Sequence, residues 1–245
     1  MPTFFVASDA IVPPTVRITG PLLRHLRQSL RLQPGEILSV TDDRGTRYRA
    51  EIAEVTGQAL VGRIVDTSSA PAKAGASIIL AQALLKGEKM DWVIQKATEL
   101  GVDRIVPVLS AHSVVRPRAD RIEHQRARWQ RIALEAAQQS ERWSLPLLDE
   151  PATVAELWSR SKTAASKILL AERSSGASLT NVPLPGAGGE VWLLIGPEGG
   201  WEPGEAAQAL QQGFAAVTLG PRILRAETAA LAAMSVLQSR LGELG

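Results

Sequence analysis

The chain has 245 residues, of which 45% are apolar and 21% are charged. This length predicts one large domain or two small ones, and the composition supports a packed core rather than a disordered chain. The absence of cysteine excludes disulfide frameworks, thiolate zinc sites and cysteine nucleophiles. With three histidines we expect no metal site. Because there is no secretory leader and no long apolar segment, we expect a cytoplasmic protein without a membrane anchor.

The charges balance overall but not locally. The formal net charge is +2. Residues 104–131 nevertheless contain seven arginines against two acidic residues, a surplus of five. Such a cluster can neutralise phosphates, although a solvated helix face explains it equally well.

The first 70 residues have a β-rich pattern. Runs at 36–40, 47–55 and 60–65 alternate partly with a period of two residues, and Asp-Arg-Gly at 43–45 predicts a hairpin turn. One short helix is expected at 22–30. The pattern is typical of a small barrel-like unit. Residues 67–76 contain small side chains with one proline and one glycine, which predicts a linker.

After residue 76, apolar strands alternate with amphipathic helices. Strands are expected at 78–84, 104–109, 168–171, 191–195 and 216–219, and helices at 88–100, 121–139, 203–212 and 226–241. This order favours a parallel sheet with helices on both faces. The polar stretch 173–189 is expected to be a mobile surface loop.

Two expected strands end in glycine-rich loops, LLIGPEGG (193–200) and VTLGPRILRAET (217–228). Ligands of α/β sheets lie beyond the carboxyl ends of strands, and glycine lets the backbone approach a ligand closely. We therefore expect one pocket lined mainly by backbone. The phosphate-loop, GxGxxG, HExxH and GxSxG motifs are absent, which disfavours nucleotide-binding, zinc-protease and serine-hydrolase functions.

Three long segments resemble the ribosomal RNA uridine-N3 methyltransferases, the RsmE family of the SPOUT superfamily. They are GEKMDWVIQKATELGV (87–102), LLIGPEGGWEPGE (193–205) and LGPRILRAETAALAA (219–233). They occur in the family's order, and residues 25–35 also resemble its start. The resemblance covers nearly the whole chain.

The resemblance implies a fold and an assembly. Residues 1–72 would form a PUA-like or OB-like β-barrel that binds RNA. Residues 73–245 would form an α/β SPOUT domain with a mostly parallel sheet, helices on both faces and a deep trefoil knot. A homodimer is also implied. The apolar face of the last helix could serve that dimer or pack within its own subunit: Ala226, Ala229, Ala230, Leu231, Met234 and Leu237.

The same resemblance implies S-adenosylmethionine (SAM) as cofactor, bound by the two glycine-rich loops and an earlier strand end. The expected cofactor-binding residues are Leu170, Glu172, Ile195, Gly196, Pro197, Glu198, Gly199, Gly200, Leu219, Gly220, Ile223, Leu224 and Arg225.

The family's reaction methylates N3 of uridine 1498 in 16S rRNA of the 30S subunit. The N3–H proton must leave before the nitrogen lone pair can attack a methyl group. Arg225, with Arg222 as second choice, is the candidate cation for the uracil anion that forms. Glu227 is the candidate base; its alternative role is to complement a helix dipole. No metal is required.

Basic residues at several places are candidates for RNA contact: Arg24, Arg27, Arg31, Lys86, Lys89, Arg116 and Arg142. For the lysines, a solvated helix face is the alternative. At 139–142 the chain reads Gln-Ser-Glu-Arg where the family has Gln-Ser-Gly-Arg. Glu141 therefore departs from the family pattern in a loop expected near RNA.

Three other functions compete with N3 methylation. The first is ribose 2′-O methylation by another SPOUT enzyme, and the second is a non-catalytic RNA-binding factor in ribosome assembly. The third is a nucleotide-binding α/β protein with no RNA partner. The intact GPEGG and LRAET segments argue against loss of catalysis. The N-terminal unit and the arginine-rich segment argue for an RNA partner.

Overall fold

The computed structural model describes residues 3–113, 119–171 and 177–245. The chain forms two compact units, one of Met1–Ala72 with Ala137–Leu145 and one of Lys73–Ala136 with Pro146–Gly245. Two expected site residues, Arg116 and Glu172, lie outside the described residues. None of the described helices is long and apolar enough to cross a membrane.

The first unit is built on a six-stranded sheet. Its strands follow the order β1 (Thr3–Phe5), β4 (Ile37–Thr41), β5 (Thr46–Val55), β6 (Leu60–Ser69), β3 (Thr15–Ile18) and β2 (Ile11–Val12). Neighbours are antiparallel except β1 and β4, which are parallel. Val16, Leu26 and Leu60 are fully buried in its core. The expected β-rich N-terminal part is confirmed, and Gly45, at φ +79°, lies in the expected hairpin turn.

The helical part of this unit differs in detail from the expected single helix. A 3-10 turn, η1 (Ser8–Ala10), precedes the sheet's inner strands, and α1 (Gly20–Arg24) continues directly into a π-helical turn, η2 (His25–Ser29). Proline occupies the first turn of α1, where the missing N–H has no intrahelical partner to lose. The segment therefore begins two residues earlier than the pattern predicted.

The linker predicted at 67–76 is wrong at its start. Strand β6 extends to Ser69, and Thr67 and Ser69 pair with Tyr48 and Thr46 of β5. The ladder supplies the backbone hydrogen bonds, so small polar side chains do not end the strand here. Pairing with a long neighbour outweighs local composition.

The segment 137–145 belongs to the first unit through Arg47. The guanidinium of Arg47 donates to the carbonyls of Glu141 at 2.8 Å and Arg142 at 3.2 Å, and it lies 4.0 Å from the ring centroid of Trp143. Glu141 has φ +52°, a conformation that glycine adopts more easily. The Arg47 contacts hold the loop in this conformation despite the side chain at 141.

The second unit contains an eight-stranded sheet in which every strand pair is parallel. The strand order is β10 (Ala152–Thr153), β8 (Arg104–Leu109), β7 (Ser77–Ala83), β13 (Glu190–Ile195), β11 (Ser166–Leu170), β14 (Ala215–Thr218) and β12 (Ala177–Ser178), with β9 (Leu147–Leu148) beside β8. The helices are α2 (Lys89–Glu99), α3 (Ala119–Gln139), α4 (Val154–Arg160), α5 (Pro203–Gln211) and α6 (Ala226–Arg240).

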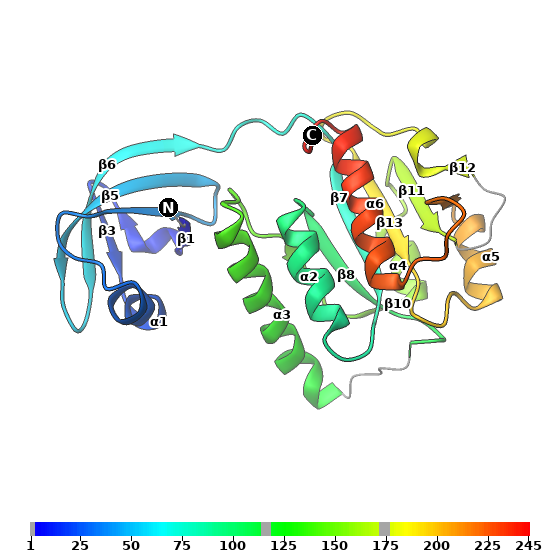
Figure 1. The fold of residues 1–245 in the computed structure, drawn as a ribbon, viewed down its shortest axis with the longest axis horizontal. Helices are drawn as coiled ribbons and strands as arrows, with labels where there is room; N and C mark the ends of the chain where they lie inside the picture. Colours follow the sequence, from blue (N-terminus) through cyan, green and yellow to red (C-terminus); the bar gives the residue numbers. More distant parts are fainter. Residues whose placement is uncertain (1–2, 114–118, 172–176) are drawn as a thin grey trace. The chain divides into compact units, whose positions relative to one another are not determined.

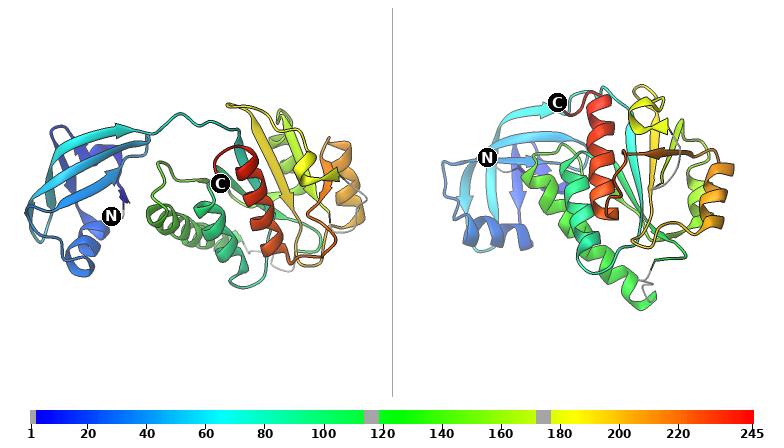
Figure 2. Two further views of the ribbon diagram at one scale, coloured as in Figure 1. Left: turned by 45° about the horizontal axis from the view of Figure 1, so that its top comes forward. Right: turned by 45° about the vertical axis from the view of Figure 1, so that its right-hand side comes forward.

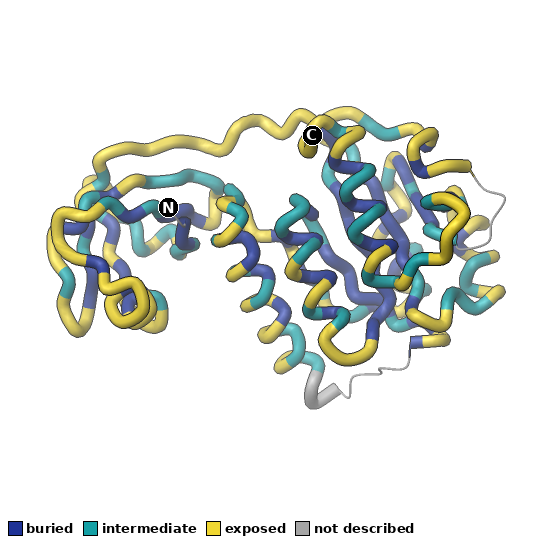
Figure 3. The backbone as a smooth tube through the Cα atoms, in the orientation of Figure 1, coloured by how far each residue is buried: buried dark blue, intermediate teal, exposed yellow. Residues whose placement is uncertain are grey.

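Helices cover both faces of this sheet, as the alternating pattern predicted. On one face Ile78 and Leu80 pack against α2, α3 and α6; on the other, Ile79 and Ala81 pack against α4 and α5. Figures 1 and 2 show α2 and α6 side by side on one side of the strands, with α5 on the opposite side. The central strands are buried along most of their length (Figure 3), which explains their continuous apolar sequences.

Of the stretch expected to be a surface loop at 173–189, residues 183–189 form no helix or strand, as expected, but residues 177–181 form short elements. Residues 177–178 form β12 beside β14, and a 3-10 turn, η3 (Leu179–Asn181), follows. Leu179 and Val182 are buried in the core, and Arg240 of α6 donates to their carbonyls at 2.8 and 2.7 Å. The apolar side chains and Arg240 order a segment that is polar in sequence.

The apolar face of α6 packs within its own subunit. Ala229, Ala230, Met234 and Leu237 are buried in the core of the second unit. These four residues therefore fit the second of the two roles that the sequence left open, whereas Ala226 and Leu231 of the same expected face are only partly buried.

Candidate active site

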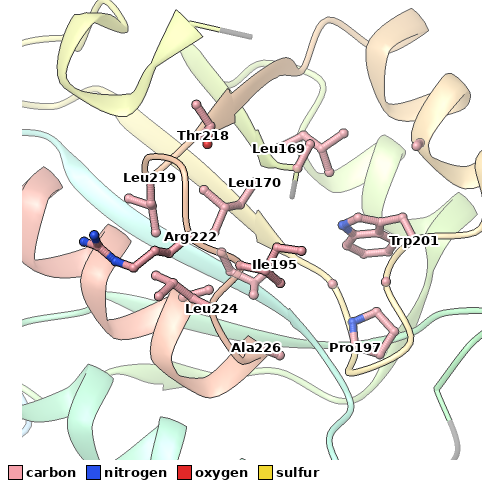
Figure 4. Close-up of a pocket in the computed structure, with 16 residues that line it drawn as sticks. Leu169, Leu170, Ile195, Pro197, Trp201, Thr218, Leu219, Arg222, Leu224 and Ala226 are labelled. Carbon is pink, nitrogen blue, oxygen red and sulfur yellow. The ribbon is translucent and has the colours of Figure 1, made fainter. Parts of the chain in front are cut away.

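A cavity lies at the carboxyl ends of three neighbouring strands. β13, β11 and β14 are adjacent and parallel, so the loops that follow them meet at one edge of the sheet. The cavity has a volume of about 310 Å³ (Figure 4). Its lining residues are Leu169, Leu170, Ala171, Ile195, Gly196, Pro197, Gly200, Trp201, Ala206, Thr218, Leu219, Arg222, Ile223, Leu224, Ala226 and Ala229. The two glycine-rich loops therefore contribute to one pocket.

Most of the expected site residues line this cavity. They are Leu170, Ile195, Gly196, Pro197, Gly200, Leu219, Arg222, Ile223 and Leu224. Four others, Glu198, Gly199, Gly220 and Arg225, belong to the same loops but do not line the cavity.

Sequence reasoning missed seven lining residues: Leu169, Ala171, Trp201, Ala206, Thr218, Ala226 and Ala229. Trp201 directly follows the GPEGG segment, so its place next to this glycine-rich loop was a signal from which it could have been predicted. Ala206 and Ala229 come from α5 and α6, and no sequence signal separates them from the other small helix residues.

Gly196 allows close packing between the β13 loop and an aromatic side chain. A Cβ atom at this position would lie 3.0 Å from Nε1 of Trp201 and 3.2 Å from its Cδ1. The Trp201 Nε1–H group is buried and has no hydrogen-bond partner among the described residues. A buried donor without a partner is destabilising unless a ligand or water supplies an acceptor. This donor is therefore available to a ligand.

Two side chains from neighbouring strands and loops contact carbonyl groups of the loop after β13. The fully buried Gln82 of β7 donates through Nε2 to the carbonyl of Gly196 at 3.4 Å. His112 Nδ1 lies 3.2 Å from the Gly199 carbonyl and 3.1 Å from the Gly200 carbonyl. Because both partners are acceptors, Nδ1 carries the proton and Nε2 is left with the lone pair when the ring is neutral.

The same loop runs into a well-capped helix. The Glu202 carboxylate accepts hydrogen bonds from the backbone N–H groups of Gly204 and Glu205, and Glu205 reciprocates by accepting from the N–H of Glu202. This is a capping box with proline in the first turn of α5. The other oxygen of Glu205 accepts from Ala111 N–H at 2.8 Å, which ties the start of α5 to the loop after β8.

Charged side chains gather beside the pocket. Lys89, in the first turn of α2, donates to Glu198 at 3.0 Å, and its Nζ lies 4.0 Å from Oε1 of Glu227 in the first turn of α6. Burial raises the pKa of Glu198, but hydrogen bonds from Lys89 and from backbone N–H groups outweigh it, so the pKa is lowered overall. Glu198 is thus held as a carboxylate.

The two candidate arginines are exposed. Arg222 lies in the loop between β14 and α6, and Arg225 is the N-cap residue of α6. In Figure 4 the guanidinium of Arg222 extends away from Trp201 and Pro197, which lie on the other side of the cavity. Ile223, between the arginines, is 57% exposed. The wall formed by this loop therefore presents cations and one apolar side chain to solvent.

The candidate RNA contacts fall in different surroundings. Arg24 and Arg27 are exposed on the α1–η2 segment, and Arg31, two residues beyond its end, is exposed as well. Lys86 is exposed, Lys89 is paired with Glu198, and Arg142 lies in the loop that Arg47 holds. Within the part of the chain that is described, no group of three or more histidine and acidic residues is placed to hold a metal ion.

Comparison with known proteins defines the class. A family model described as an RNA methyltransferase domain matches residues 72–238, and one described as an RNA methyltransferase PUA domain matches residues 18–65. The pocket at the strand ends lies within the first match. Fold and site together are those of an RNA methyltransferase domain joined to a PUA domain.

The relatives are more specific. Ribosomal RNA small subunit methyltransferase E from Synechocystis is 34% identical over 96% of this chain and 77% of its own length, and that from Bacillus subtilis is 30% identical over 91% and 90%. The crystal structure of the Neisseria gonorrhoeae enzyme of that name, bound to SAM, covers 98% of both chains with 32% identity and a TM-score of 0.87. The chain belongs to the ribosomal RNA small subunit methyltransferase E family, as the sequence motifs predicted.

The pocket fits the cofactor that the resemblance implies. SAM combines a flat adenine ring with a ribose and a charged amino acid, so its site needs an apolar slot together with hydrogen-bonding backbone. Leu170, Ile195 and Leu224 supply apolar walls, and Gly196 and Gly200 line the cavity with backbone that carries no side chain. The unpartnered indole N–H of Trp201 is a further donor for a ligand. Nothing in the described wall opposes this ligand.

Proposed function

We propose that this protein transfers the methyl group of SAM to N3 of a uridine in 16S rRNA, at position 1498, in the 30S subunit. The observation that carries the proposal is the shared cavity formed by the loops after β11, β13 and β14. Membership of the family and the SAM-bound relative support the cofactor and the RNA substrate. The exposed cations beside the cavity favour an anionic substrate.

The cofactor-binding role falls to the apolar walls and the glycine-rich loops. SAM, when bound, supplies an electrophilic methyl group on a sulfonium sulfur. Leu170, Ile195 and Leu224 would hold it and exclude water, while the loop at 196–200 would bind through backbone groups. Glu198, Gly199 and Gly220 would act by shaping these loops.

Proton removal and charge stabilisation fall to α6 and the loop before it. The imide proton of uracil must leave N3, and Glu227 is the proposed acceptor because it is the carboxylate in the first turn of α6. Arg225, with Arg222 as second choice, would stabilise the negative charge that develops on the uracil oxygens. Uracil N3 lies on the Watson–Crick edge, so the base must leave any pair before it reaches the pocket.

The roles of the two domains follow. We assign RNA binding to residues 1–72, where Arg24, Arg27 and Arg31 are exposed, and methyl transfer to residues 73–245. The trefoil knot, the homodimer and the cytoplasmic location stay predictions from the resemblance. Sedimentation equilibrium tests the dimer directly, and a single species of monomer mass at micromolar concentration would contradict it.

One experiment tests the proposal as a whole. The purified protein is incubated with methyl-labelled SAM and 30S subunits that lack the modification, the rRNA is digested, and the labelled nucleoside is identified. Label in 3-methyluridine is the expected result. Label in a 2′-O-methyl nucleoside would overturn the N3 assignment but keep the fold class. No label, with subunits that a control enzyme methylates, would favour a non-catalytic RNA-binding role.

A further inference from the structure

Three charged side chains from separate parts of the chain meet beside the pocket. Lys89 begins α2, Glu198 follows β13, and Glu227 begins α6. The Lys89 ammonium lies 3.0 Å from Glu198 Oε1 and 4.0 Å from Glu227 Oε1. The sequence assigned these residues to three different roles, as an RNA contact, a cofactor contact and a base. Their meeting at one ammonium group indicates a common role.

The Glu198 contact anchors the glycine-rich loop to the start of α2. Oε1 of Glu198 accepts from the Lys89 ammonium and, at 3.2 Å, from the backbone N–H of Lys86. Gly196 and Gly200, on either side of Glu198, line the cavity. The carboxylate therefore connects the part of the loop that lines the pocket to a helix that is packed in the core.

The Glu227 carboxylate is held more loosely and is unsatisfied on one side. Its side chain is 13% exposed, and its Oε2 atom is buried without a hydrogen-bond partner among the described residues. A carboxylate oxygen in this state lacks a donor that it would normally have. Ala226, the preceding residue, lines the cavity. Glu227 therefore directly follows a residue of the cavity wall, although it does not line the cavity itself.

We propose that Lys89 is a positioning residue for methyl transfer, which holds the Glu227 carboxylate and the 196–200 loop in their working places through one ammonium group. The proposal deepens the proposed function and rests on it. Lys89 acts here within the protein and not as a contact for an RNA phosphate. Its 38% exposed side chain already has two carboxylate neighbours, whereas Lys86, three residues earlier, approaches Glu198 through its backbone N–H.

Kinetics with Lys89→Met and Lys89→Arg test this role. The Met variant keeps most of the length of the side chain and removes its charge. If Lys89 positions the reacting groups, kcat falls about 10- to 100-fold, KM for 30S subunits changes little, and Lys89→Arg recovers a large part of kcat. If Lys89 instead contacts an RNA phosphate, the Met variant should bind RNA more weakly with an unchanged kcat. The slope of log K for RNA binding against log salt concentration should then be reduced by about 1. That second result would overturn the proposal.

Lys96→Met is the matched control. It removes the same charge from the same helix, where Lys96 pairs with Glu99 at 2.8 Å. We expect wild-type kcat for this variant, since the Lys96–Glu99 pair is within α2 and reaches neither loop. If Lys96→Met and Lys89→Met lose activity equally, general charge explains the effect and the positioning role is wrong. Thermal melts of all three variants test whether loss of fold is the cause of any loss of activity.

A double-mutant cycle tests whether Lys89 acts through Glu227 or independently of Glu227. Glu227→Gln removes the carboxylate charge with little change in shape. If Lys89 acts through Glu227, adding Lys89→Met to this background lowers the single-turnover rate by less than about 3-fold. A full repeat of the single-mutant loss would show that Lys89 acts independently of Glu227 and would overturn the part of the proposal in which Lys89 holds that carboxylate. Failure of the wild-type protein to form 3-methyluridine is a different result, because it would reject the proposed function itself.

Discussion

At the scale of single residues, Arg225 has a structural role through its backbone and a proposed chemical role through its side chain. Its backbone carbonyl accepts the hydrogen bond of Ala229 N–H at 2.8 Å, which starts α6, while its side chain is exposed near the cavity. Only the side chain is lost on substitution by alanine. The variant therefore tests the proposed charge-stabilising role without removing the backbone bond.

Arg225→Ala should reduce methyl transfer far more than SAM affinity. The cation acts on charge that develops only during the reaction, and removal of one such stabilising group lowers kcat about 100- to 1,000-fold in comparable sites. Single-turnover rates and calorimetric titration with SAM measure the two quantities. Equal losses in both would make Arg225 a cofactor-pocket residue instead.

Gly196 is required by contact and not by backbone conformation. A Cβ atom there would be 3.0 Å from the Trp201 indole nitrogen. Gly196→Ala should therefore displace the indole, weaken SAM binding and lower the free energy of unfolding by about 1–3 kcal/mol. Gly186→Ala is the control, since no atom lies within 4 Å of its added Cβ. Denaturant unfolding and SAM titration of both variants check this expectation, and similar behaviour of the two would contradict it.

At the scale of elements, the pocket depends on how loops are tied to helices. Glu198 connects the loop after β13 to α2, and its pKa lies below the ordinary value of 4.5. A carboxylate whose pKa is lowered by folding stabilises the folded state at pH values above its unfolded pKa. That stabilisation disappears as the pH falls through the folded-state pKa.

The expected result is a difference between the wild type and Glu198→Gln that depends on pH. At neutral pH the wild type should unfold at higher denaturant concentration than the variant. The difference should shrink as the pH falls from about 5 to below the folded-state pKa, because the wild-type carboxyl group is then neutral as well. Urea unfolding at a series of pH values measures it. A difference that stays constant across this range would exclude the ionised carboxylate as its source.

At the scale of the whole molecule, RNA affinity must come from local clusters because the formal net charge is only +2. Arg24 and Arg27 lie exposed on the same helical segment of the first unit. Each arginine that neutralises a phosphate releases bound counterions from the RNA, and this release makes affinity depend on salt. The surface charge of this unit can therefore be tested separately from catalysis.

Replacing both Arg24 and Arg27 by glutamine should weaken binding to 30S subunits and reduce the salt slope of log K by roughly 1.5–2. SAM affinity should stay at the wild-type value, because neither residue lines the cavity. Binding assays between 50 and 200 mM salt measure the slope. An unchanged slope would show that these arginines do not contact phosphates and would move RNA binding to other residues.

Patterns within the sequence predicted much of the framework. The long helices and the central strands were found because buried strands are apolar throughout and helices repeat their apolar residues every three to four positions. Strand β8 and the first residue of α5 and α6 agree with the prediction to the residue. The short strands β2, β9, β10 and β12, two residues each, were not predicted, because so few residues carry no periodic signal.

By itself, the sequence determined the alternation of strands and helices, the two glycine-rich loops and, through long motifs, the family. Only the tertiary structure decided which residues meet. His112 against the carbonyl of Gly199, and Lys89 between Glu198 and Glu227, join segments far apart along the chain. Contacts of this kind arise when the parallel strands align and bring their carboxyl ends to one edge. No local pattern encodes that alignment, so the pairings that build the site had to be seen in the folded chain.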